Sequence, residues 1–340
     1  MERLDAFMAR ANAAYYATRD PFADFTTSPE ITQVFGELLG LWAAVTWDLL
    51  GRPAPVLLVE AGPGRGTLMA DALRAVGQVA PAFRAALTVH LIETSPRLRR
   101  LQAAALPGAI WHDGLASVPQ GPLLVLANEF LDALPIRQFV RHGTTWAERF
   151  VADGRFVEAG GAAAPPGMDS ARGGQGARGE SAGGVGGPVV YEFCEQARAF
   201  ATEVAARAIA HPGAVLMLDY GPEQSTLGDS LQAIADGRPA DVLSPPGTAD
   251  LTAHVDFESL AAIARAGGAA VHGPIPQGVF LAHLGLFQRT DRLARGQPPR
   301  RAGALIEAAQ RLAEPNRMGR LFKAMAFCHP DCPTPPGFAA

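Results

Sequence analysis

The feature that most constrains the fold is a strand, a glycine-rich turn and a helix in direct succession. Four apolar residues at 56–59 end at Glu60, and the turn from Gly62 to Thr67 has glycine at every second position. Residues 68–74 then take the apolar spacing of a helix. Because glycine tolerates positive φ and leaves room for a ligand beside the backbone, this order predicts a binding loop at the carboxyl edge of a parallel sheet.

Three more apolar runs of strand length end in polar side chains. Glu93, Asn128 and Asp219 each follow such a run, and helical segments separate the runs along the chain. Strands that alternate with helices in this way predict a doubly wound α/β fold with a mostly parallel sheet. At 340 residues the chain is long enough to bury such a sheet and to carry an additional lobe.

The spacing of the glycines and the charge around them distinguish between two nucleotide-type ligands. A dinucleotide loop has the pattern G-x-G-x-x-G, whereas this chain has Gly62, Gly64 and Gly66, and Pro63 removes one backbone N–H donor. Acidic residues near the loop would repel a pyrophosphate. S-adenosylmethionine carries a sulfonium and an ammonium group and no phosphate. The site therefore favours S-adenosylmethionine over NAD.

The strand-end residues are assigned to parts of this cofactor. Glu93 is predicted to accept hydrogen bonds from the ribose hydroxyls, and Asp113 from the adenine amino group. Turn chemistry alone would also allow Asn128 as a capping residue and Glu129 as a solvated carboxylate. The predicted cofactor contacts are Glu60, Gly62, Pro63, Gly64, Gly66, Thr67, Glu93, Thr94, Asp113, Gly114 and Asn128.

Outside the glycine loop, local patterns predict the helices and strands of the first half of the chain. Residues 4–16 have the spacing of an amphipathic helix. Ser28 is predicted to cap a second helix, with Pro29 at its first position and Glu30 near its positive end, and this helix continues past residue 45. Alternating apolar and polar residues at 136–157 predict a β-hairpin.

The second half of the chain contains longer irregular stretches. Residues 158–188 are rich in glycine and poor in aliphatic residues, which predicts a mobile loop without chemistry. We expect a helix at 191–210, a loop-rich region at 225–246, a helix at 280–287 and a final edge strand within 318–327. The predicted division is a helical segment and lid at 1–50, a cofactor-binding core at 51–135 and 189–330, the hairpin at 136–157, the loop at 158–188 and a tail at 330–340.

Composition excludes several other classes of protein. The formal net charge of −4 and the pI of about 6.1 argue against nonspecific nucleic-acid binding. Three cysteines do not form a disulfide framework, and their spacing predicts no metal site. No apolar run approaches the roughly 20 residues that cross a bilayer, and acidic residues near Met1 are untypical of a targeting segment. We expect a cytoplasmic, bacterial protein.

Four motifs together resemble the MidA-like family of S-adenosylmethionine-dependent methyltransferases. They are DFTTSPEI at 24–31 with FGE at 35–37, EAGPGRGT at 60–67, NEFLDALP at 128–135 and DLTAHVDF at 250–257. The resemblance implies a class I methyltransferase fold with an added helical and β-hairpin lobe. Because the family includes the mitochondrial complex I assembly methyltransferase, it also implies a protein substrate, such as a complex I subunit, that is methylated on arginine. The chain departs from the family before Asp24, where a glycine-rich extension is missing, and at Gly237, where relatives often have histidine.

Methylation of a protonated guanidinium requires carboxylates that orient it and disperse its charge. Glu129, Asp132 and Asp24 are the predicted catalytic acids, with Glu129 first because it follows a strand end directly. Two alternatives stay open from the sequence: a methyltransferase that acts on a small molecule, and a noncatalytic assembly factor that binds S-adenosylmethionine. The sequence identifies neither the acceptor nor the oligomeric state.

Overall fold

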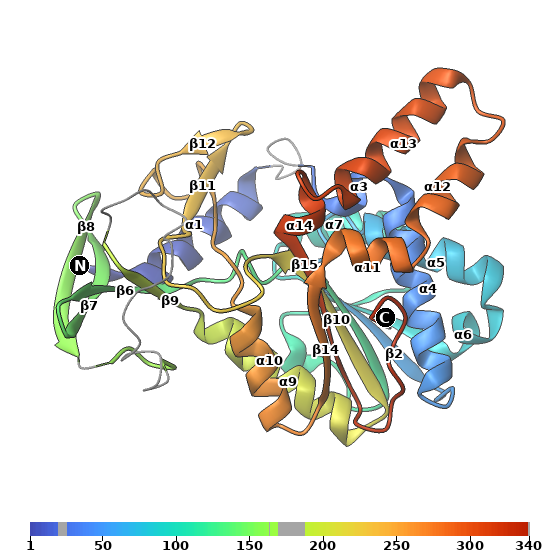
Figure 1. Ribbon diagram of the computed structural model, residues 1–340, viewed down its shortest axis with the longest axis horizontal. Coiled ribbons are helices and arrows are strands. Elements are labelled where there is room, and N and C mark those ends of the chain that lie inside the picture. The colour runs from blue at the N-terminus through green and yellow to red at the C-terminus, as the bar shows by residue number, and fades with distance from the viewer. Residues whose placement is uncertain (20–25, 163, 169–187, 339–340) are drawn as a thin grey trace. The chain divides into compact units, whose positions relative to one another are not determined.

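The computed structural model describes residues 1–19, 26–162, 164–168 and 188–338 (Figure 1). Within these residues the chain divides into two compact units. The first comprises Met1–Phe25, Asp132–Ala199 and Gln224–Asp256, and the second comprises Thr26–Leu131, Phe200–Glu223 and Phe257–Ala340. No helix in the described part of the chain is long and apolar enough to cross a membrane.

The second unit is built on a seven-stranded sheet in the order β14-β15-β10-β5-β2-β3-β4. The five strands from β10 to β4 are parallel to their neighbours, and β15 is antiparallel to both β10 and β14. The bounds are β2 Val56–Ala61, β3 Leu87–Ile92, β4 Ile110–His112, β5 Leu123–Asn128, β10 Gly213–Tyr220, β14 Ala270–Pro276 and β15 Phe322–Cys328. The predicted doubly wound, mostly parallel α/β fold is confirmed.

Several helices cover this sheet with their apolar faces. A single core cluster joins α4, α5 and α6 to the strands, with Trp42, Leu58 and Leu126 among its buried members. Figure 1 shows α9 and α10 on the other side of the strands. The helices and the one 3₁₀ turn of this unit are α3 Ser28–Ile31, α4 Gln33–Leu49, α5 Thr67–Val79, α6 Pro81–Ala86, α7 Pro96–Ala105, η1 Leu115–Ser117, the second part of α9 Glu195–Ala210, α10 Phe257–Ala266, α11 Gln277–His283, α12 Leu286–Ala294, α13 Pro299–Ala313 and α14 Met318–Leu321.

The last strand does not lie where the sequence predicts. The pattern at 318–327 predicts an edge strand, but β15 lies between β10 and β14, and β14 forms the edge. Every residue of β15 after Phe322 is buried, including Lys323. Strands that are buried on both faces usually show an unbroken apolar run, and Lys323 interrupts that run here, where its ammonium donates to the carbonyl of Gly221.

Two predicted single helices are each interrupted. Ser28 is the first residue of α3 and does not cap it, and α3 ends before Thr32, whose hydroxyl accepts a hydrogen bond from the N–H of Val34 at the start of α4. The predicted helix at 280–287 is split between α11 and α12 by Gly285, with φ +90°. In both places one residue leaves helical geometry and starts a new helix.

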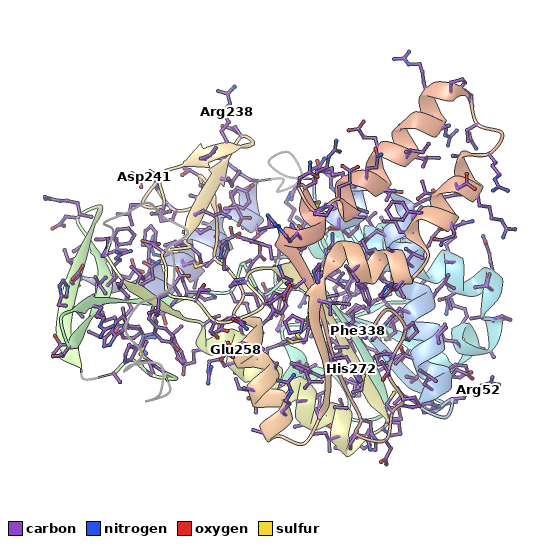
Figure 2. All side chains as sticks on the ribbon, viewed as in Figure 1. Arg52, Arg238, Asp241, Glu258, His272 and Phe338 are labelled. Carbon is purple, nitrogen blue, oxygen red and sulfur yellow. The ribbon has the colours of Figure 1, made fainter. Side chains whose placement is uncertain are left out.

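The C-terminal segment closes against α11 and β14. Phe338 lies with its ring centroid 5.0 Å from that of Phe280 and 6.1 Å from that of His272. Figure 2 shows Phe338 and His272 near one another beside β14. This aromatic group covers part of the edge strand, which would otherwise present unpaired backbone groups.

The first unit contains helix α1 and two small sheets. One sheet has the order β1-β7-β6-β9 with β8 paired to β7, and the other has the order β12-β11-β13. The bounds are α1 Leu4–Thr18, β1 Glu2–Arg3, β6 Arg137–His142, β7 Thr145–Ala152, β8 Arg155–Ala162, β9 Val190–Phe193, β11 Gln232–Ala235, β12 Arg238–Ala240 and β13 Asp250–Thr252. The predicted hairpin at 136–157 is confirmed by the antiparallel pairing of β6 and β7.

Three expectations for this unit need correction. The predicted helix at 191–210 starts as strand β9, and α9 begins only at Glu195. The glycine-rich stretch at 158–188 begins inside β8, and residues 169–187 lie outside the described part. The region 225–246 contains β11 and β12. β9 pairs with the distant strand β6, and such a partner leaves little trace in the local pattern of residues. In contrast, β8 pairs with the preceding strand β7, and β11 pairs with β12 across the turn at Asp236 and Gly237.

Candidate functional site

The glycine loop has the backbone geometry that its sequence predicts. Gly62, Gly64 and Gly66 have φ of +66°, +54° and +83°, in the region that L side chains rarely adopt. A Cβ atom at Gly62 would lie 2.9 Å from Cδ2 of Phe130. The N–H of Gly66 donates to the carbonyl of Pro63 at 2.7 Å, which closes the turn before α5. The loop therefore needs glycine for both its conformation and its close contacts.

Two buried polar atoms beside the loop lack hydrogen-bond partners among the described residues. These atoms are Oε2 of Glu60 and Oδ1 of Asn128. Glu60 is only 3% exposed, and burial raises the pKa of its carboxyl to about 8, although the backbone N–H of Met69 donates to it. Since buried polar atoms nearly always have partners, these two acceptors fit a ligand that brings cationic or donor groups. The residues present thus fit S-adenosylmethionine.

Glu93 is held at the end of β3 by a residue that sequence reasoning missed. Gln102 of α7 is fully buried, and its amide nitrogen donates to the carbonyl of Gly64 at 2.7 Å and to Oε2 of Glu93 at 3.2 Å. Its amide oxygen accepts from Nε1 of Trp111 at 2.8 Å. Burial raises the pKa of Glu93, and the backbone N–H of Ser95 donates to Oε1 at 2.7 Å. Gln102 therefore ties the glycine loop to the predicted ribose acid.

Three other predicted cofactor residues lie at the ends of β3 and β4. Asp113 is exposed, with 88% of its side chain accessible, and it pairs with Arg99 at 2.6 Å. The backbone N–H of Thr94 donates to the Glu93 carboxylate. The carbonyl of Gly114 accepts from Ser117 at the start of the short turn η1. Their roles toward a cofactor stay predictions.

Glu129 occupies a strained turn after β5. Its φ is +49°, its N–H donates to the carbonyl of Leu218 at 2.8 Å, and burial raises the pKa of its carboxyl. The N–H of Ser28 and the amide of Asn128 donate to the same oxygen, Oε1, at 2.8 and 3.1 Å. A non-glycine residue at positive φ is rare enough to suggest a functional constraint.

The strand-end acid Asp219 builds the turn that presents Glu129. Its carboxylate accepts from the backbone N–H groups of Phe130, Leu131 and Tyr220 at 2.8–3.1 Å. Asp219 is 1% exposed. Its place at a strand end was visible in the sequence, but its role as a support for the turn was not.

Helix α3 contacts the same edge of the sheet. The hydroxyl of Thr67 donates to Glu30, and the Arg65 guanidinium lies 3.8 Å from the other oxygen of that carboxylate. Glu30 therefore joins α3 to the glycine loop, and Ser28 joins α3 to the turn that carries Glu129. The predicted catalytic residue Asp24 lies outside the described residues.

The third predicted catalytic acid, Asp132, belongs to the first unit. Its carbonyl accepts from the N–H of Ala253 at 3.0 Å. Burial, followed by the charges of Asp250 and Asp132, raises the pKa of Tyr16 well above its ordinary value, and Tyr16 hydrogen-bonds to Asp250. These contacts bring together residues from three segments of the unit. A catalytic role for Asp132 stays a prediction.

Replacing Gln102 with leucine should weaken the binding of S-adenosylmethionine about tenfold, which corresponds to the loss of one or two hydrogen bonds of ordinary strength. The change leaves Glu93, the carbonyl of Gly64 and Trp111 without the shared amide. We expect a shifted tryptophan emission in addition to the weaker binding seen by calorimetry. Gln78→Leu on the exposed side of α5 is the matched control. Equal affinity in the native protein and the Gln102 variant would show that the bridge is only structural.

Known proteins resemble this chain along most of its length. Residues 38–275 match the model of a family described as "Putative S-adenosyl-L-methionine-dependent methyltransferase". The chain is 34% identical over 343 residues to protein arginine methyltransferase NDUFAF7, mitochondrial, of Danio rerio, covering 91% of this chain and 78% of the relative. The human protein of that name is also 34% identical, with coverage of 92% and 76%. The Drosophila melanogaster homolog is 33% identical, with coverage of 96% and 80%.

Two solved structures have the same fold over nearly the whole chain. One, a COG1565 superfamily protein from Burkholderia thailandensis, is 26% identical with a TM-score of 0.79, covering 99% of this chain and 90% of that one. The other is a member of the same superfamily from that organism, bound to S-adenosyl-homocysteine. It is 24% identical with a TM-score of 0.74 and coverage of 98% and 89%. Both are similar in fold to this chain.

Proposed function

This chain belongs to the family of S-adenosyl-L-methionine-dependent methyltransferases, and on that premise we propose that it methylates arginine side chains of a protein. It is an enzyme of the methyltransferase class and its cofactor is S-adenosylmethionine. The arginine acceptor is supported by the names of its relatives and by one observation in the structure: a partly buried carboxylate, Glu129, at positive φ after the central strand β5.

We propose that the cofactor is held by the glycine loop, Glu60, Glu93 and Asn128. The free acceptors on Glu60 and Asn128 suit an ammonium and a polar donor, and Glu93 suits ribose hydroxyls. When bound, S-adenosylmethionine supplies a methyl group on a sulfonium, which a nucleophile takes by in-line displacement. The protein then acts mainly through alignment and charge, because no covalent intermediate with the enzyme is required.

Glu129 has the chemistry to orient a guanidinium. The hydrogen bonds from Ser28 and Asn128 both end on Oε1, which leaves Oε2 with acceptor capacity. An ionised carboxylate at this place would pair with the guanidinium and stabilise positive charge while one nitrogen attacks. Asp132 and Asp24 stay proposed as additional substrate-side acids.

The finer proposals concern the acceptor, which the resemblance implies, and the location, which follows from the sequence patterns. We propose a respiratory complex I subunit as a candidate acceptor and a cytoplasmic location for this chain. The curated relatives carry the word mitochondrial in their names, which describes those proteins.

The test is transfer of radioactive methyl from S-adenosylmethionine to an extract of a strain that lacks this protein. We expect label in a polypeptide, and acid hydrolysis of that polypeptide should release methylated arginine. Label in small molecules only would instead indicate a metabolite methyltransferase. Binding of S-adenosylmethionine without transfer to any component would indicate a noncatalytic assembly factor. A heat-inactivated sample of the protein serves as the control.

A further inference from the structure

The helical hairpin formed by α12 and α13 is strongly basic. Residues 286–313 contain six arginines and two carboxylates, whereas the whole chain has a formal net charge of −4. Figure 1 shows the two helices side by side, projecting away from the central sheet. Charge of one sign is therefore concentrated on a single protruding element of an acidic protein.

The two acids of the hairpin are already engaged. Asp291 pairs with Arg295, and Glu307 lies 3.3 Å from Arg317. Arg289 is turned to the body of the unit, where its Nε donates to Glu37 of α4 at 2.7 Å. The four other hairpin arginines, Arg292, Arg300, Arg301 and Arg311, are exposed and have no ion pair within the described ranges.

The positions of Arg300 and Arg301 are unfavourable for the helix that carries them. Both stand in the first turn of α13, which contains no acidic residue. The N-terminus of a helix bears a partial positive charge, so cations there destabilise the helix. Arginine has a high intrinsic helix propensity, but no ion pair within the described residues offsets the two charges at this helix end, whereas binding of an anionic partner would.

Apolar side chains accompany the arginines. Phe287 on α12 and Ile306 on α13 are 47% and 48% exposed. Interleaved apolar and arginine side chains are typical of protein interfaces. The net negative charge of the remaining chain disfavours a long polyanion such as a polynucleotide, whereas a short acidic segment of a protein could contact the hairpin alone.

The hairpin adjoins the edge of the sheet that carries Glu129. Arg289 ties α12 to α4, and α4 follows α3, whose Ser28 N–H donates to Glu129. Burial is the main cause that raises the pKa of Glu129, and the positive charge of Arg311 on α13 offsets part of it. Arg300 stands in the first turn of the same helix, eleven residues before Arg311, which is about 16 Å along the axis at 1.5 Å per residue. An acidic segment that lies along α13 would therefore run from Arg300 and Arg301 toward the proposed arginine-binding carboxylate.

We propose that the α12–α13 hairpin docks an acidic segment of the protein substrate and so delivers the acceptor arginine to the methyltransferase site. The inference rests on the proposed function, since it takes the substrate to be a protein. It specifies that the acceptor carries glutamate and aspartate residues near the arginine or on the adjacent surface.

The first test is binding of a fluorescent peptide of alternating glutamate and leucine, with a lysine and leucine peptide as the contrast. We expect the native protein to bind the acidic peptide, with affinity that falls as salt rises. Arg300→Glu combined with Arg301→Glu should weaken this binding at least tenfold. Arg84→Glu with Arg265→Glu, which makes the same change of charge on exposed helices elsewhere, should leave it within twofold. Equal loss in both double variants would overturn the proposal.

The second test separates this inference from the proposed function. In the methyl-transfer assay, the hairpin variant should need at least a tenfold higher concentration of acceptor protein, while its affinity for S-adenosylmethionine stays unchanged. Unchanged transfer by the variant would overturn the docking role and leave arginine methylation standing.

If no protein accepts methyl, the proposed function fails and peptide binding alone decides the docking role. Stronger hairpin-dependent binding to phosphatidylglycerol vesicles or to single-stranded RNA would also overturn it. Should the glutamate variant not fold, Arg300→Gln with Arg301→Gln replaces it.

Discussion

Replacing Glu129 with glutamine should lower the rate of methyl transfer by about a hundredfold or more and leave the affinity for S-adenosylmethionine within about twofold. Glutamine keeps the shape of the side chain and an oxygen that can accept from the N–H of Ser28. It removes the negative charge that would orient a guanidinium. Single-turnover transfer and calorimetry, measured on the same sample, separate the two effects.

The control for this variant is Glu223→Gln, an exposed carboxylate in the same unit that should have no effect. Full transfer by the Glu129 variant, at native cofactor affinity, would remove Glu129 from the mechanism. A parallel loss of transfer and of cofactor binding would instead place Glu129 in the cofactor site.

The pH dependence of transfer gives a further readout on the same residue. Burial raises the pKa of Glu129 above its ordinary value of 4.5, so the carboxyl is protonated over a wider acidic range than a solvated glutamate. The protonated form cannot pair with a guanidinium. Transfer by the native protein should therefore increase as pH rises through this shifted pKa, and the residual activity of the glutamine variant should lack that step.

Replacing Glu60 with glutamine should stabilise the protein without cofactor at neutral pH. Burial raises the pKa of Glu60 to about 8 from an ordinary value of 4.5, so the folded protein holds a proton that the unfolded chain releases. The stability that this proton contributes is complete below about pH 4.5 and is lost as pH rises to about 8. At pH 7 the free energy of unfolding of the native protein is lower by about 3 kcal/mol than it is below pH 4.5. The reason is that each pH unit above the pKa of the unfolded chain costs about 1.36 kcal/mol.

Urea unfolding at several pH values measures this effect. The glutamine variant should gain free energy of unfolding over the native protein, and the gain should grow between pH 5 and pH 8. Glutamine cannot titrate, and its amide can still accept from the N–H of Met69. A gain that is equal at pH 5 and pH 8 would show that the Glu60 carboxyl titrates normally.

The same variant should lose the pH dependence of cofactor binding. S-adenosylmethionine has a net positive charge, so its ammonium group favours ionised Glu60, and binding by the native protein should release a proton below about pH 8. As pH rises toward that value, the affinity for S-adenosylmethionine should therefore increase by up to about tenfold per pH unit, because one pKa unit corresponds to a factor of ten. Glu60→Gln should abolish that slope. Calorimetry in buffers of different ionisation enthalpy counts the protons.

The fold class and the core of the site were predictable from local patterns. Apolar runs that end at Glu60, Glu93 and Asn128 predicted the parallel strands, because strands buried on both faces are continuously apolar. The glycine spacing predicted the turn, since positive φ is a requirement of each residue by itself. Missing phosphate-binding features and nearby acids then predicted S-adenosylmethionine, and the family match confirms this cofactor.

Sequence patterns could not predict contacts between distant segments. Gln102 joins Gly64 to Glu93, and Ser28 contacts Glu129 across 101 positions. The spacing of residues along one helix gives no information about a partner so far away. The break at Thr32 and the interior position of β15 likewise depend on what packs beside them.

The chain by itself thus determined the class of fold, the glycine turn and the type of cofactor, because conformational limits and burial act residue by residue. Tertiary structure alone decided which amide supports the loop, which turn presents Glu129, and that the arginines of α12 and α13 gather on one projecting hairpin. The physical reason is that hydrogen bonds and local charge depend on distances in space, which become defined only when separate segments of the chain pack together.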